Sequence, residues 1–191
     1  YIKFTNRFEN VKHLAEASED EILSMWQGLG YYSRGRNLRK AAIQVMEEYN
    51  GKFPTNSKEL KKLKGIGDYS SAAIASFSSN EKIAVVDGNV YRVLSRLFGI
   101  RTPIDSTSGK KEFNDLANTL ISSNYPAEHN QAMMEFGAKQ CTPKKPSCDK
   151  CIFSSSCEAL NLNSVFELPV KAKKIKKKSR YFYFFLDIKD D

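Results

Sequence analysis

The sequence predicts an all-α fold, and three observations support this prediction. Apolar residues recur at helical spacing through most of the 191-residue chain. Capping residues and glycines separate these runs into segments of ordinary helix length. No run of 18 or more apolar residues occurs, so we expect no membrane-spanning helix. The composition, with 41% hydrophobic and 27% charged residues, is that of a globular protein.

The first predicted helices lie in the segment 18–49. Ser18 followed by Glu21 forms a capping-box pattern at the start of a short helix. Gly28 and Gly30 end that helix. A longer helix is predicted from Tyr32 to Tyr49, where the apolar positions have helical spacing, and the Asn-Gly pair that follows ends it.

Two helices around a tight turn are predicted next. We expect Ser57 to cap a helix that runs to Leu63, and Asp68 to cap a second helix over Tyr69–Ser79. Between them, Gly65-Ile66-Gly67 forms a turn that residues with a Cβ atom cannot follow where φ is positive. The second helix is rich in serine and alanine, which permits close packing.

Three further helices complete the predicted all-α part. Asp87 is expected to cap a helix ending at Gly99, and two more are expected near Lys110–Ser122 and Ala127–Lys139. The segment after Cys141 has a loop-like composition. From about residue 161 the chain becomes a linker rich in lysine, and residues 181–188 alternate too weakly to define the faces of a strand.

The net charge of +8 suggests a polyanionic partner, but its distribution limits that inference. Residues 170–180 contain seven basic residues and no acidic residue. Without them, 23 basic residues face 22 acidic ones, so a DNA-binding surface must come from local clusters. Two clusters are candidates for phosphate contacts or simply form solvated helix faces: Arg34, Arg36, Arg39 and Lys40, and Lys58, Lys61, Lys62 and Lys64.

All four cysteines lie within 17 residues, in the spacing Cys141-x6-Cys148-x2-Cys151-x5-Cys157. The close pair can place two thiolates on one metal centre, and the flanking cysteines can complete a cage of four sulfurs. Two disulfides are the alternative, but the chain lacks the composition of a disulfide scaffold. Structural zinc usually has two close pairs, so one close pair between distant single cysteines favours an iron-sulfur cluster over zinc.

Two segments carry features of a site that binds a sugar-phosphate strand. The glycines of Lys64-Gly65-Ile66-Gly67 let the backbone approach a phosphate at the start of the following helix, although a plain helix connection uses the same residues. The segment 85–90 places Asp87 at the first turn of a helix. Asp87 is therefore either a simple N-cap or an anion that faces a developing positive charge.

The hairpin, Asp87 and the four-cysteine loop stand in the order found in iron-sulfur DNA glycosylases similar to endonuclease III. Within that superfamily, the chain most resembles the MutY-type adenine DNA glycosylases over about residues 1–169. The motifs that carry this resemblance are Gly28-Leu29-Gly30-Tyr31-Tyr32-Ser33-Arg34, Gly51-Lys52-Phe53-Pro54, Asp87-Gly88-Asn89-Val90 and Asn130-Gln131-Ala132-Met133-Met134.

The resemblance implies a helix-hairpin-helix fold with a DNA-binding cleft between two helical domains. The implied division is an incomplete helical barrel with the hairpin (1–82), an iron-sulfur cluster domain (83–163), a basic linker (164–179) and the first strand of a truncated NUDIX-like domain (180–191). It also implies a [4Fe-4S] cluster bound by Cys141, Cys148, Cys151 and Cys157. Related proteins carry a general-acid glutamate upstream of the segment that matches Tyr1, so we expect this chain to lack it and to be inactive as given.

The implied activity is base-excision repair of double-stranded DNA that contains adenine opposite 8-oxoguanine or guanine. After extrusion of the adenine, Asp87 would stabilise the oxocarbenium-like sugar, with support from Asn89 and Tyr69. Gln131 would contact the base, and Tyr31 would enter the base stack. The implied DNA contacts are Arg34, Lys64, Gly65, Ile66 and Gly67. The resemblance further implies a monomer in the bacterial cytoplasm, associated with the nucleoid.

Other interpretations remain open. An endonuclease III-like glycosylase with lyase activity needs a Schiff-base lysine where Tyr69 stands. Lys64 occupies a hairpin position where the family usually has proline. The chain alone could also be a non-catalytic DNA-binding module stabilised by metal. Without the resemblance, Gln131 would be read as a polar group on a helix surface and Tyr31 as a core aromatic residue.

Overall fold

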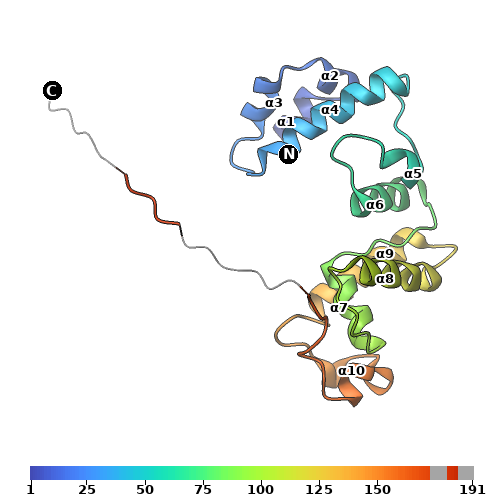
Figure 1. Ribbon diagram of the computed structural model, residues 1–191. Helices are drawn as coiled ribbons and strands as arrows, with labels where there is room; N and C mark the ends of the chain where they lie inside the picture. Colours follow the sequence, from blue (N-terminus) through green and yellow to red (C-terminus); the bar gives the residue numbers. More distant parts are fainter. Residues whose placement is uncertain (173–179, 185–191) are drawn as a thin grey trace.

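The computed structural model describes residues 1–172 and 180–184, and this part of the chain contains ten α-helices and two short 3-10 helices but no strand. Figure 1 shows that the helices follow one another along a C-shaped body. Helices α1 to α6 form one half, here called the hairpin lobe, and α7 to α10 form the other, here called the cysteine lobe. Within the described residues, no helix combines the length and the apolar character needed to cross a membrane.

The far end of the hairpin lobe contains the first four helices, which are α1 (Ile2–Arg7), α2 (Val11–Glu16), α3 (Glu19–Met25) and α4 (Tyr32–Glu48). The predicted cap at Ser18 is confirmed, because its Oγ accepts a hydrogen bond from the Glu21 N–H at 3.1 Å. The predicted long helix is also confirmed as α4. Phe8, Ala17 and Ile22 form a small buried core beneath these helices.

Helix α5 is shorter than predicted and has a different cap. It spans Ser57–Leu60, and the side chain of Asn56 accepts a hydrogen bond from the Glu59 N–H at 2.9 Å. The prediction that Ser57 caps a helix to Leu63 is therefore wrong. The N–H and hydroxyl of Ser57 both donate to the carboxylate of Glu81, at 2.6 and 2.8 Å, so Ser57 serves as the first helical residue instead.

Helix α6 (Asp68–Ser79) begins one residue before the predicted position. Its N-cap is Gly67, whose backbone is extended, and no side chain caps the first turn. The prediction that Asp68 is the cap is therefore wrong. Asp68 lies inside the helix and forms an ion pair with Lys61. A buried core of Ala41, Val45, Leu60, Leu63 and Ala75 packs α4, α5 and α6 together.

Three helices form the body of the cysteine lobe, and they are α7 (Gly88–Leu97), α8 (Thr107–Leu120) and α9 (Pro126–Lys139). Helix α8 begins three residues before the predicted Lys110, because Ser106 caps it by accepting a hydrogen bond from the Gly109 N–H at 2.9 Å. The core of this lobe consists of Ala84, Val90, Leu94, Phe113, Ala117 and Ile121.

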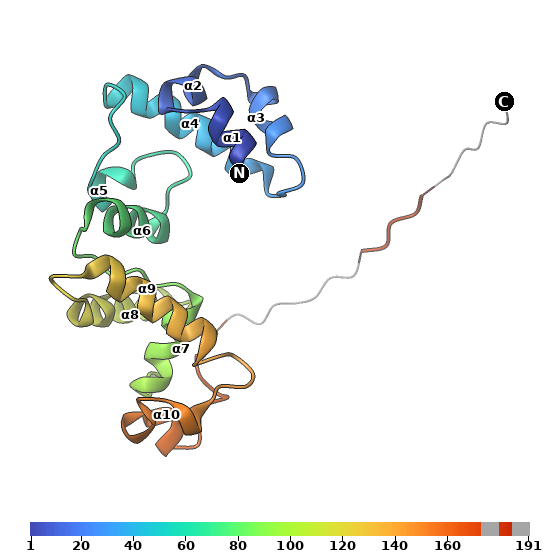
Figure 2. The same ribbon diagram turned by 180° about the vertical axis from the view of Figure 1, so that it is seen from behind.

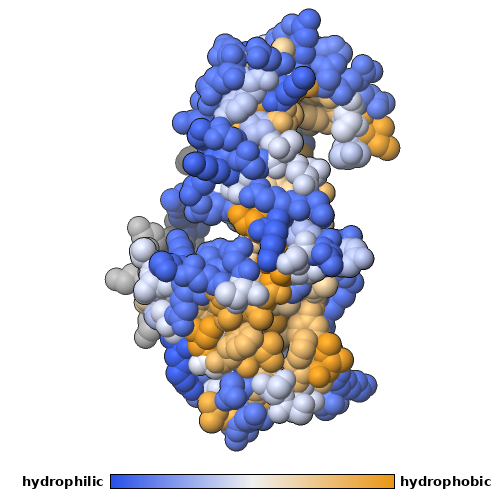
Figure 3. All heavy atoms as spheres, turned by 90° about the vertical axis from the view of Figure 1, so that its right-hand side faces the viewer, coloured by the Kyte–Doolittle hydropathy of each residue, from blue (hydrophilic) through white to orange (hydrophobic). Residues whose placement is uncertain are grey.

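Figure 3 shows apolar residues gathered on one face of the cysteine lobe and mostly hydrophilic residues at the opposite end of the molecule.

The cysteine segment ends in three short helices, which are η1 (Cys148–Lys150), η2 (Ser154–Ser156) and α10 (Glu158–Asn161). Beyond them, Ser164, Val165 and Leu168 are buried, and the two apolar residues pack with Ala159 of α10. Figure 2 shows this segment beside α7. Residues 181–184 form no strand, so the described part of the expected strand does not support that prediction, and its remainder lies outside the described residues.

Candidate functional site

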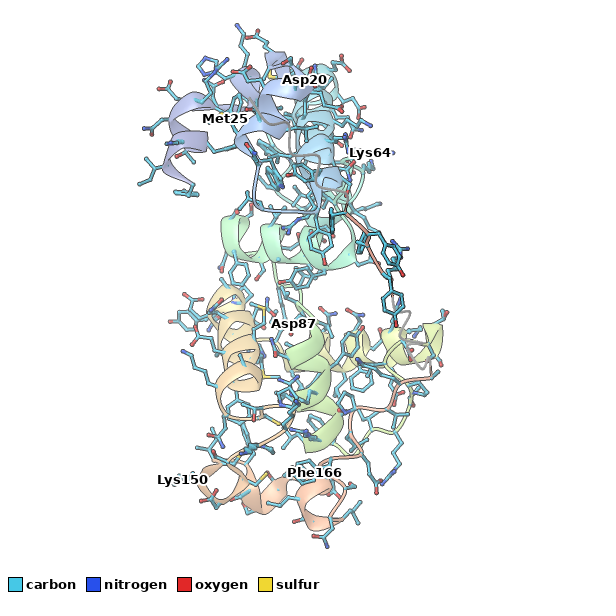
Figure 4. The ribbon with its side chains drawn as sticks, turned by 90° about the vertical axis from the view of Figure 1, so that its left-hand side faces the viewer. Asp20, Met25, Lys64, Asp87, Lys150 and Phe166 are labelled. Atoms are coloured by element: carbon cyan, nitrogen blue, oxygen red, sulfur yellow. The ribbon has the colours of Figure 1, made fainter. Side chains whose placement is uncertain are left out.

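Asp87 is the N-cap of α7, and its carboxylate accepts three hydrogen bonds. Oδ1 accepts from the backbone N–H groups of Asn89 and Val90, both at 2.8 Å, and Oδ2 accepts from the Asn89 side-chain amide at 2.9 Å. The predicted cap is thus confirmed, while the supporting role expected of Asn89 stays a prediction. The side chain is half-buried at the point where the chain passes from the hairpin lobe to the cysteine lobe (Figure 4).

The extended segment before Asp87 takes its hydrogen-bond partners from two asparagine side chains. The Ala84 N–H donates to Asn118 of α8 at 3.0 Å, and the Val85 N–H donates to Asn130 of α9 at 2.9 Å. A buried backbone group without a hydrogen-bond partner lowers the stability of the folded protein. The side-chain amides of Asn118 and Asn130 therefore favour one backbone conformation of this segment. The position of Asp87 therefore depends on helices that come later in the sequence.

A chain of hydrogen bonds leads from Asp87 to the first cysteine. Arg92 on α7 is only 8% exposed and donates to the side-chain oxygen of Asn89 at 2.9 Å. Its Nε also donates to the backbone oxygen of Cys141 at 2.7 Å. Burial lowers the pKa of Arg92 below its ordinary value. Sequence reasoning missed Arg92, although a charged residue on the apolar side of a predicted helix is a usable signal.

The two glycines of the hairpin between α5 and α6 have different backbone conformations. Gly65 has a φ of +81°, and an added Cβ would lie 2.6 Å from the Cβ of Asn37. Gly67 has a φ of −97° and open space where a Cβ would be, so the expected strain applies to Gly65 alone. No side chain caps the start of α6, and a helix N-terminus favours anions.

All four cysteines have free thiols and line a single pocket, together with Arg96 and apolar side chains. Burial raises the pKa of Cys148 above its ordinary value, and the charges of the other three sulfurs raise it further. Within the described residues, no three His, Cys, Asp or Glu side chains gather closely enough to hold one metal ion. Four cysteine sulfurs around one pocket are nevertheless a donor set that both iron-sulfur clusters and structural zinc take in proteins.

Comparison with known proteins assigns the chain to one family. Residues 1–119 match the model of the HhH-GPD superfamily of base excision DNA repair proteins. The chain belongs to this superfamily.

Several relatives of this HhH-GPD protein are named adenine DNA glycosylase. The rat enzyme is 41% identical over 83% of this chain and 31% of its own length. The enzyme of Buchnera aphidicola from Baizongia pistaciae is 36% identical over the whole chain and 54% of its own length. The chain therefore spans about a third to a half of the length of these relatives.

Solved structures confirm the fold of this HhH-GPD protein. A thermostable thymine-DNA glycosylase has a TM-score of 0.78 at 30% identity, over 85% of this chain and 75% of that protein. A non-covalent endonuclease III–DNA complex has a TM-score of 0.73 at 22% identity, over 84% of this chain and 74% of that protein. The second likeness concerns the fold alone.

The structure also locates three further predicted site residues, which are Tyr69, Gln131 and Tyr31. Tyr69 lines a pocket of about 460 Å³ that also contains Val86, the residue before Asp87. Gln131 lines a separate shallow pocket on α9 and donates to Glu135 at 2.8 Å. Tyr31 is 81% exposed, so the alternative of a core aromatic residue is wrong. The roles of these three residues stay predictions.

Proposed function

We propose that this chain carries the catalytic aspartate of an adenine DNA glycosylase, which hydrolyses the N-glycosidic bond of adenine paired with 8-oxoguanine or guanine. The observation that carries the proposal is the carboxylate of Asp87, fixed by three hydrogen bonds at the start of α7. The names of the relatives support adenine as the base. Double-stranded DNA with such a mispair is the proposed partner.

In this proposal Asp87 acts on the sugar after the adenine has left the base stack. Departure of the base leaves positive charge on the sugar, and a fixed carboxylate stabilises that charge without moving. Asn89 keeps the carboxylate oriented, and Gly88 leaves open space beside it for a DNA backbone. The hairpin around Gly65 and Gly67 binds the sugar-phosphate strand, with Lys64 and Arg34 as basic contacts.

We also propose that Cys141, Cys148, Cys151 and Cys157 hold a [4Fe-4S] cluster. The support is the single pocket that all four thiols line, together with the spacing in which one close pair lies between two distant single cysteines. When bound, the cluster ties the segment 141–157 into one structural unit and so braces α7. Iron content and visible absorption of the purified protein test this proposal, and colourless protein containing zinc would contradict it.

The test of the activity is single-turnover release of adenine from a duplex with adenine opposite 8-oxoguanine. It compares this chain alone with a longer form to which additional sequence from a relative is joined, because the chain spans only about a third to a half of the length of its relatives. Asp87→Asn should lower the rate in the active form by roughly 10²–10⁴-fold. Asparagine is an equally good N-cap, so the variant should remain folded.

Asp115→Asn is the matched control, since Asp115 is an exposed residue of α8 paired only with Lys111 among the described residues. The Asp115→Asn variant of the longer form should release adenine at the same rate as the longer form without the substitution. If the longer form released no adenine, or if Asp87→Asn had no effect, the glycosylase proposal would fail and a non-catalytic DNA-binding module would remain.

The presence of Tyr69 supports a glycosylase without lyase activity. A lyase forms a Schiff base with a lysine amine, and a tyrosine hydroxyl cannot do so. Treatment of the reaction with borohydride should therefore trap no covalent protein–DNA adduct. A trapped adduct at good yield would favour the glycosylase/lyase alternative.

A further inference from the structure

Arg96 is a buried cation at the edge of the cysteine pocket. Its side chain belongs to α7, one turn after Arg92, and the residue is 3% exposed. Within the described part of the chain it forms no ion pair with a carboxylate. A buried charge is unfavourable unless hydrogen bonds and an opposite charge compensate it. The compensation for Arg96 must therefore come from the groups that surround it.

Most of those groups are neutral carbonyls from both ends of the cysteine segment. Nη1 donates to Thr142 at 2.8 Å and Nη2 donates to Pro143 at 3.3 Å, just after the first cysteine. Nε donates to Val165 at 2.9 Å and to Leu168 at 3.2 Å, beyond the last cysteine. These bonds give each of the guanidinium nitrogens a partner, but they supply no negative charge.

The remaining contact is with a sulfur. Nη1 of Arg96 lies 3.4 Å from Sγ of Cys141, and Arg96 lines the pocket that contains all four thiols. Four thiolates around a cluster give this pocket a net negative charge. Arg96 is thus both a hydrogen-bond donor to one ligand sulfur and a cation buried beside the whole group.

We propose that Arg96 sets the reduction potential of the iron-sulfur cluster, as its buried counter-charge. This inference rests on the cluster assigned under the proposed function, but not on adenine release. Reduction adds one negative charge to the cluster. A fixed cation and an N–H···S bond stabilise the reduced form more than the oxidised form, and they act strongly in a site with little water. Arg96 therefore raises the potential.

The experiment measures the midpoint potential of iron-loaded protein by spectroelectrochemical titration, for the wild type, Arg96→Gln and Arg96→Lys. Arg96→Gln removes the charge and should shift the potential to a more negative value. Arg96→Lys keeps the positive charge but loses the planar guanidinium group and its hydrogen-bond geometry. The shift of the midpoint potential in this variant should therefore have the same sign and be smaller. The control is Arg101→Gln, because Arg101 is an exposed arginine of the same lobe, paired with Glu167 at 2.9 Å.

A purely structural role for Arg96 gives a different result. Its variants would then lose iron to a chelator faster than the wild type, while the potential of the protein that still holds iron would be unchanged. That result would overturn the inference. If Arg96→Gln did not load iron, an unchanged potential in Arg96→Lys would overturn it as well. Wild-type protein that contains no iron would overturn both the cluster and this inference, whereas absence of adenine release would affect only the glycosylase proposal.

Discussion

The side-chain amide of Asn130 binds the backbone of Val85, 45 residues earlier in the chain and two residues before Asp87. Its oxygen accepts the Val85 N–H at 2.9 Å, while its nitrogen donates to Ser76 of α6 and to the Ile83 oxygen, both at 2.9 Å. Asn130 is 2% exposed. One buried amide thus joins α9, α6 and the segment that carries the proposed catalytic carboxylate.

Asn130→Ala should lower the free energy of unfolding by about 2–4 kcal/mol, because it leaves the buried Val85 N–H without a partner and breaks two further bonds. Urea unfolding monitored by circular dichroism measures this change. Gln131→Ala alters the next, exposed position of the same helix and should cost less than about 0.5 kcal/mol. Equal losses for the two variants would show that the buried amide has no special importance.

The two hairpin glycines should respond differently to alanine. Gly65→Ala should destabilise the protein by at least about 1–2 kcal/mol, because φ is +81° and the new Cβ would meet Asn37. Gly67→Ala should leave the melting temperature nearly unchanged, since its φ is ordinary and the space is open. It should still weaken binding to duplex DNA several-fold, because the new methyl group would stand in the proposed path of a phosphate.

Thermal melts and fluorescence anisotropy with labelled duplex DNA separate these two effects. Unchanged affinity of Gly67→Ala would remove the support for phosphate binding at this turn.

Helices α7 and α9 meet so closely at Gly137 that a larger residue cannot fit. An added Cβ would lie 2.6 Å from the Cβ of Asn89 and 2.9 Å from its backbone oxygen. We expect Gly137→Ala to cost about 1–3 kcal/mol of stability and to displace Asn89 from the Asp87 carboxylate. Gly88→Ala, where the corresponding space is open, should leave stability within about 0.5 kcal/mol of the wild type. The reverse order in urea unfolding would contradict the packing described for these helices.

Stability should depend on pH through His129 of α9. Burial against an apolar pocket lowers the pKa of His129 below its ordinary value of 6.5. The unfolded chain therefore binds the proton more readily than the folded protein does. The contribution of neutral His129 to the free energy of unfolding is fully present above about pH 6.5. It is lost as the pH falls through the lower pKa of the folded state.

His129→Gln should consequently lose less stability than the wild type between pH 7 and pH 5. Urea midpoints at several pH values measure the difference between the two proteins. Parallel curves over this range would show that His129 is equally accessible to protons in both states.

Local sequence signals predicted most of the helices but not the details of their starts. Ser18 and Asp87 cap the helices that they were expected to cap. At the other two sites the true caps were Asn56 and Gly67, each one residue before the predicted residue. Two adjacent residues of similar capping ability differ only in the backbone angles that they have in the packed chain. The local sequence does not indicate these angles, so it does not show which of the two residues is the cap.

The sequence by itself determined the cysteine spacing, the glycine of the hairpin turn and the aspartate at the start of α7, because each depends on residues close together in the chain. Only the tertiary structure identified Arg92, Arg96 and Asn130 as parts of the site. Their main partners are backbone groups as distant as Val165, which lies 69 residues beyond Arg96. Every residue has a backbone carbonyl, so the sequence does not indicate which carbonyl will accept such a hydrogen bond. The tertiary fold determines which backbone groups lie within reach of a buried side chain.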